Sequence, residues 1–137
     1  MNAISLDTYS WVWYISGNLT LNKTTRKIIT SALQQHTAHL AAISLWEIAM
    51  LEKKQRIILE MPFLEWIHKS LEVTSIRILP LTPSIAMESC SLPGQFHGDP
   101  ADCMIVATAR VEGLSLITRD AKILSYARNK YLSVIKA

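Results

Sequence analysis

The sequence predicts an α/β domain in which helices cover both faces of a mainly parallel sheet. Strand-like and helix-like apolar segments alternate along the whole chain, and strands that are separated by helices pair in parallel. The chain has 137 residues, of which 50% are hydrophobic and 18% are charged, so it can bury a substantial core. No repeat or flexible linker interrupts it, and we expect one domain over residues 1–137.

The predicted elements follow the apolar periodicity and its interruptions. Strands are expected at residues 3–6, 39–43, 75–79, 114–118 and 132–135. Helices are expected from residue 8, across 24–35, from 44 into 52–55, across 63–71, from 82, across 99–111 and across 120–127. Thr8 and Ser44 are the expected caps of their helices, and Gly17 and Gly113 are expected helix ends.

Composition excludes several classes of protein. The longest apolar stretches are too short to span a bilayer, and the N-terminus lacks the charged region and cleavage site of a signal peptide. The two cysteines have neither a metal-ligand spacing nor the density of a disulfide scaffold. We therefore expect a cytoplasmic protein without a membrane partner.

The net charge is +3 although the chain contains eleven acidic residues. If several acids gather in one cleft, the remaining surface is more basic and favours an anionic partner. Ordinary surface charge explains the same value equally well.

Two acids lie just past the carboxyl ends of predicted strands. Asp7 comes after the first strand, and Asp120 comes two residues after the strand at 114–118. In a parallel α/β sheet the ligand crevice lies beyond the carboxyl ends of the strands. Both carboxylates are therefore expected at this rim.

Two further acids lie in the first turns of helices that begin at the same rim. Glu47 is in the helix after the second strand, and Asp102 is in the helix that starts near Pro100. Carboxylates held close together raise one another's pKa unless a cation neutralises them. Oxygen ligands favour Mg²⁺ or Mn²⁺, which could orient a phosphodiester and activate a water for its hydrolysis.

Each of these acids also has a local explanation. Ser44 and Glu47 match a capping box, in which Glu47 would only accept a backbone hydrogen bond. Asp99 before Pro100 is a favourable N-cap. The other acids have local roles of the same kind, namely a dipole interaction for Asp102, an N-cap for Asp120 and a turn for Asp7. Periodicity alone does not decide between separate caps and one shared site.

The order of these motifs resembles that of the PIN domain, and within it the VapC-like toxins of bacterial toxin–antitoxin pairs. The matching segments are ISLDT at residues 4–8, SLWEIA at 44–49, HGDPADCMIVATA at 97–109 and LITRD at 116–120. The third segment is the most specific. Four motifs in this order span nearly the whole chain.

The resemblance implies a three-layer α/β/α sandwich and a Mg²⁺- or Mn²⁺-dependent endoribonuclease that acts on transfer or ribosomal RNA. It implies a homodimer held inactive by a cognate antitoxin. The implied catalytic residues are Asp7, Glu47, Asp102 and Asp120, and the implied metal ligands are Asp7, Asp102 and Asp120. The resemblance also implies that Asp99 and Thr118 are auxiliary residues of this site.

One departure concerns the residue after the third acid, where the family often has arginine and this chain has Cys103. Arg110 or Arg119 could supply the missing phosphate contact. Arg119 and His97 are RNA-binding candidates, although a strand-end arginine and a loop histidine need no function.

The four tryptophans are candidates for stacking on RNA bases. Trp11, Trp46 and Trp66 fit apolar helix faces and are predicted in the core, whereas Trp13 is a candidate for an exposed surface. Two other functions are compatible with the sequence: a catalytically silent PIN-like module that binds RNA or protein, and a nuclease that acts on DNA or on a nucleic-acid structure.

Overall fold

The computed structural model describes residues 3–96 and 98–137, and its centre is a parallel sheet. The strands follow the spatial order β3-β2-β1-β4-β5, and every pairing between neighbours is parallel. Their bounds are β1 Ile4–Leu6, β2 Ala38–Ala41, β3 Arg77–Leu79, β4 Ser115–Thr118 and β5 Val134–Lys136. The predicted parallel α/β sheet is confirmed.

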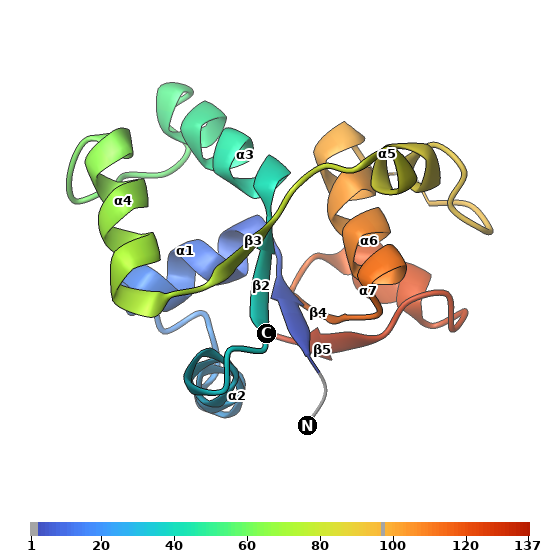
Figure 1. Cartoon of the computed structure of the whole chain (residues 1–137), viewed down its shortest axis with the longest axis horizontal. Coiled ribbons are helices and arrows are strands. Elements are labelled where there is room, and N and C mark those ends of the chain that lie inside the picture. Colours follow the sequence, from blue (N-terminus) through green and yellow to red (C-terminus); the bar gives the residue numbers. More distant parts are fainter. Residues whose placement is uncertain (1–2, 97) are drawn as a thin grey trace.

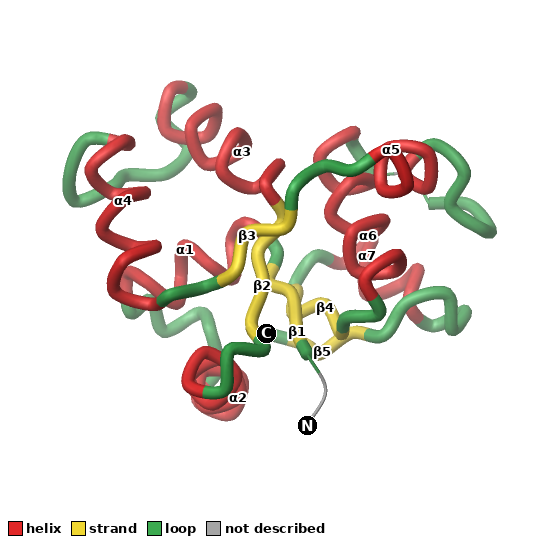
Figure 2. Tube along the Cα trace, in the orientation of Figure 1, coloured by secondary structure: helices red, strands yellow, loops and turns green. Residues whose placement is uncertain are grey.

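The helices form one layer on each side of this sheet. Their bounds are α1 Thr8–Ser16, α2 Lys23–Gln34, α3 Ala42–Lys53, α4 Phe63–Thr74, α5 Pro83–Ser89, α6 Pro100–Glu112 and α7 Ala121–Ala127. Helices α1, α2 and α4 lie on one side, and α5, α6 and α7 lie on the other (Figure 1). The tube view shows the strands enclosed between these two groups (Figure 2). The expected three-layer α/β/α sandwich is confirmed.

Two apolar clusters bind the layers together. One joins β1 and β2 to helices on the first side through side chains such as Trp11, Ile29 and Trp66. The other joins β4 to α6 and α7 through side chains such as Ile105 and Leu116. Every residue of β1 is buried, as expected for a central parallel strand that is covered on both faces.

The helix starts differ from two sequence predictions. Asp7, not Thr8, is the N-cap of α1, because its side chain accepts the Ser10 backbone N–H. Helix α3 begins at Ala42, immediately after β2, and no side chain caps it. Ser44 is therefore inside the first turn, fully buried, and the capping box predicted for Ser44 and Glu47 is wrong.

The tryptophan predictions are confirmed in part. Trp11 and Trp66 are buried, but Trp46 is 55% exposed, so its placement in the core is wrong. The reason is the helical period: Ser44 and Ile48 are the buried residues of α3, and Trp46 is two positions, about 200° of rotation, from each. Among the described residues, no helix is long and apolar enough to cross a membrane.

Replacing Leu116 by alanine is expected to lower the free energy of unfolding by about 2–5 kcal/mol, because this strand residue is fully buried and the change leaves a cavity. The matched control is Leu64→Ala, since Leu64 is 69% exposed on α4. It should change stability by less than about 0.5 kcal/mol. Urea unfolding of both variants measures the difference, and equal effects would contradict the assigned core.

Candidate active site

The register of the sheet brings the carboxyl ends of β1 and β4 to the same edge. Leu6 pairs with Ile117, so the next residues, Asp7 and Thr118, are neighbours. The backbone N–H of Asp7 donates to the Ile117 carbonyl at 3.0 Å. The Thr118 hydroxyl donates to Asp7 Oδ2 at 2.5 Å. This edge of the sheet, which we call the carboxylate rim, thus begins with a buried Thr–Asp pair.

Both oxygens of Asp7 have a hydrogen-bond donor. Oδ1 accepts the Ser10 backbone N–H at 2.9 Å, and Oδ2 accepts from Thr118. The residue is only 8% exposed. Burial raises the pKa of Asp7, the hydrogen bonds from Ser10 and Thr118 oppose this, and the charge of Asp120 raises it further. Each oxygen retains a lone pair for another ligand.

Thr118 also positions Asp120. Its hydroxyl oxygen accepts the Asp120 backbone N–H at 3.0 Å, so one fully buried side chain contacts both acids. Asp120 is the N-cap of α7, and its Oδ1 accepts the Ile123 N–H at 2.9 Å. The predicted N-cap of this helix is therefore present. The same carboxylate lies close enough to Asp7 for its charge to raise the pKa of Asp7.

Glu47, on α3, is positioned by a hydroxyl at the start of α1. The Thr8 hydroxyl donates to the Glu47 carboxylate, and the Thr8 and Ser44 hydroxyl oxygens are hydrogen-bonded at 3.1 Å. Thr8 and Ser44 are buried, and sequence reasoning assigned both of them to capping. The sequence feature that could have predicted this role of Thr8 is its position directly after the strand-end residue Asp7.

Asp99 and Asp102 reach the rim from the start of α6. Asp99 Oδ1 accepts the Asp102 backbone N–H at 2.8 Å, which confirms Asp99 as the N-cap. Glu47, Asp99 and Asp102 each place one carboxylate oxygen within 4.8 Å of the others. Asp99 is thus both a helix cap and a member of the acidic group.

Electrostatics show that these acids form one cluster. Burial raises the pKa of Asp102 to about 7, with further contributions from the charges of Asp99, Asp120, Glu47 and Asp7. Burial also raises the pKa of Glu47. The hydrogen bond from Thr8 lowers this pKa, and the charges of Asp99 and Asp7 raise it further. The structure therefore brings together the four acids singled out in the sequence, with Asp99 as a fifth member.

The donor set fits a divalent cation. Five carboxylates offer only hard oxygen ligands, which Mg²⁺ and Mn²⁺ prefer. Burial is the main cause of the raised pKa values of Asp7, Glu47 and Asp102, and the charges of the neighbouring carboxylates raise them further. A cation at this rim would remove the repulsion between these charges.

The basic candidates lie in different places. His97 is outside the described residues. Arg119 is exposed, and its guanidinium donates to the Thr20 carbonyl at 2.9 Å. Arg110 pairs with Glu88 at 2.6 Å and is eight residues along α6 from Asp102, about 12 Å away. Arg110 therefore does not replace the arginine that is absent at Cys103.

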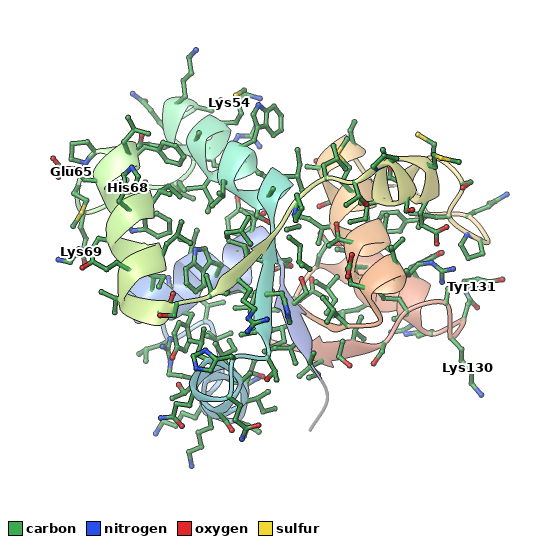
Figure 3. The ribbon with its side chains drawn as sticks, in the orientation of Figure 1. Lys54, Glu65, His68, Lys69, Lys130 and Tyr131 are labelled. Atoms are coloured by element: carbon green, nitrogen blue, oxygen red, sulfur yellow. The ribbon has the colours of Figure 1, made fainter. Side chains whose placement is uncertain are left out.

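One large cavity is separate from the rim. It has a volume of about 570 Å³ and is lined by α1, α2 and α4 residues, including Tyr14, Trp66 and Lys69. Lys69 projects from the outer part of α4 in Figure 3. None of the five clustered carboxylates lines this cavity. The rim, unlike this cavity, brings five carboxylates together, and it is therefore the candidate active site.

The profile of the PIN domain family matches residues 4–129, and the chain belongs to this family. Within it, the chain is 33% identical to Ribonuclease VapC22 of Mycobacterium tuberculosis over 134 residues, which cover 98% of this chain and 99% of that relative. The resemblance stated from the motifs is therefore confirmed.

Solved structures share the fold. VapBC2 from Rickettsia felis, bound to a promoter DNA fragment, matches with a TM-score of 0.70 and 16% identity over 98% of each chain. A toxin–antitoxin complex from Klebsiella pneumoniae matches with a TM-score of 0.63 and 21% identity over 97% of this chain and 96% of that chain. At these identities the likeness establishes the architecture.

Asp102→Asn is expected to stabilise the metal-free protein at pH 8 by about 1 kcal/mol, a value reduced for solvent screening of a half-exposed group. The pKa of Asp102 rises on folding from 3.8 to about 7. The folded state therefore binds this proton more tightly, and stability is lost as the pH rises between these values. The amide cannot ionise, so the variant avoids the loss.

Urea unfolding with chelator present, repeated from pH 8 down to about pH 4, measures this effect. The gain should shrink as the pH falls, because the native carboxyl is then protonated in the folded state. The exposed Glu72 on α4 provides a control variant, Glu72→Gln, with little change at any pH. A gain that is independent of pH would contradict the raised pKa of Asp102.

Proposed function

We propose that this protein is a divalent-metal-dependent endoribonuclease and the toxin of a toxin–antitoxin pair. The observation that supports it most strongly is the convergence of five carboxylates at the carboxylate rim, where ligands bind in parallel α/β sheets. The 33% identity to a relative named Ribonuclease VapC22, over nearly the full length of both chains, favours RNA as the substrate.

The proposed metal ligands are Asp7, Asp102 and Asp120. When bound, Mg²⁺ or Mn²⁺ would orient the scissile phosphate, offset its charge and lower the pKa of an attacking water. Thr118 fixes Asp7 through its hydroxyl and Asp120 through the backbone. Asp99 adds a fifth carboxylate beside Asp102 while it caps α6.

Glu47 is the proposed proton acceptor. Burial and the neighbouring carboxylates raise its pKa, which favours a group that takes up a proton during the reaction. The Thr8 hydroxyl bonds one oxygen of Glu47 and leaves the other available. Thr8 is itself hydrogen-bonded to Ser44, so the glutamate is oriented by two buried hydroxyls.

The proposed protein partner is an antitoxin. Structural neighbours that share the fold were solved as toxin–antitoxin assemblies, among them VapBC-5 from Mycobacterium tuberculosis, with a TM-score of 0.60 and 17% identity. A homodimer, a cytoplasmic location and a transfer or ribosomal RNA target complete the proposal. These follow from the family resemblance of the four motifs.

Asp7→Asn is expected to reduce RNA cleavage by at least about 10²-fold, because it removes one charged ligand from the rim while retaining side-chain volume. The assay measures cleavage of single-stranded RNA with Mg²⁺ or Mn²⁺, beside a DNA of the same sequence. DNA cleavage at an equal rate would exclude the assignment to RNA.

The matched control is Glu65→Gln, which neutralises an exposed acid on the outer side of α4 (Figure 3). This variant should cleave like the wild type. Thermal unfolding of both variants shows whether the fold is retained. A folded Asp7→Asn protein with full activity would exclude the proposed site.

Mg²⁺ is expected to stabilise the folded protein, because the cation binds a site that the unfolded chain lacks. At ten times the dissociation constant the gain is about 1.4 kcal/mol. Thermal unfolding with and without chelator measures this gain, which should decrease in Asp102→Asn. An unchanged melting temperature at every Mg²⁺ concentration would contradict cation binding at the rim.

A further inference from the structure

Helix α3 presents one side to the core and a different side to solvent. Ser44 and Ile48 are buried, whereas Trp46 is 55% exposed. Residues four apart lie above one another on a helix, so Trp46 and Met50 form a row that Lys54, the residue after the helix, extends. The row is about 12 Å long at 1.5 Å per residue, and it begins next to Glu47.

This row lines a cavity of about 240 Å³. The lining also includes Glu47 and Asp99 of the carboxylate rim. The remaining lining residues are Leu51, Arg56, Pro100 and Ala101. The cavity, which we call the α3 groove, is therefore continuous with the candidate active site.

Two exposed cations lie at the far end of the α3 groove. Lys54 follows the end of α3, and the turn at Gln55, with φ 58°, directs the chain back so that the Arg56 N–H donates to the Leu51 carbonyl at 2.9 Å. Neither side chain forms an ion pair with an acid in residues 3–96 or 98–137. Figure 3 shows Lys54 at the outer end of α3.

We propose that the α3 groove binds the single-stranded RNA segment next to the scissile bond. Trp46 stacks on a base, and Lys54 and Arg56 contact phosphates. This inference rests on the proposed ribonuclease function and specifies where its substrate binds. An exposed indole combined with unpaired cations is the surface that single-stranded nucleic acids recognise, and continuity with Glu47 and Asp99 favours RNA over a protein partner.

Fluorescence titration tests the stacking. The probe is a single-stranded RNA of mixed sequence, added with Ca²⁺ so that the carboxylates are neutralised, and recovered afterwards to verify that it is intact. RNA should quench tryptophan emission mainly through Trp46, because it is the one exposed indole among the four, Trp11 and Trp66 being buried and Trp13 half-buried. Trp46→Phe should lose this quenching and retain most of the affinity, since phenylalanine preserves a ring for stacking.

Affinity is measured in parallel with labelled RNA. Trp46→Leu, which retains apolar volume without a ring, should weaken binding by about 5- to 150-fold. Lys54→Ala should weaken it and reduce the slope of log affinity against log salt by about 0.7. Lys130→Ala is the matched control, because Lys130 is exposed in the turn before β5, on the other side of the molecule (Figure 3).

The outcomes separate this inference from the proposed function. If the wild type cleaves RNA but Trp46→Leu and Trp46→Phe bind equally well, or Lys54→Ala behaves like Lys130→Ala, the α3 groove is not the RNA site. If Trp46→Leu leaves RNA affinity unchanged and alters the oligomeric state in light scattering, the surface is a protein interface instead. If the wild type does not cleave RNA, the ribonuclease proposal is overturned. Quenching of Trp46 by RNA would in that case still support RNA binding in the α3 groove.

Discussion

The parallel pairing of β1 with both β2 and β4 is the constraint on which the site depends. Because the carboxyl ends of these strands meet at one edge, Asp7 lies beside Thr118 and close to the start of α3. The Thr118 hydroxyl then contacts Asp7 directly and holds the backbone of Asp120. A slip of one residue in this register would separate the Thr–Asp pair and direct each strand side chain to the opposite face.

Helix capping and formation of a shared acidic site are compatible in this protein. Asp7, Asp99 and Asp120 each accept a backbone N–H at the start of a helix. A carboxylate has two oxygens and about four lone-pair positions, so a cap uses one part of the group and leaves the rest for another ligand. The caps also fix the orientation of the side chains, and the positive ends of three helix dipoles offset part of the repulsion between them.

Helix α3 shows how one element serves both the core and the rim. Its inward face contributes Ile48 to the core and Ser44 to the hydroxyl pair with Thr8. Glu47, the residue before Ile48, joins the carboxylates, and Trp46 is exposed to solvent. Helical rotation alone thus separates core packing, the proposed proton transfer and the proposed contact with RNA among adjacent residues.

The sequence by itself determined the order of strands and helices, the parallel sheet and the placement of Asp7 and Asp120 at strand ends, because these depend on local periodicity and on a general rule for parallel sheets. Tertiary structure decided the rest. The start of α3 at Ala42 removed the expected capping box, and the packing of the Ser44 and Ile48 side of α3 against the core left Trp46, on the other side, exposed. Both results depend on which elements pack together across the sheet, and local spacing contains no information about such long-range contacts.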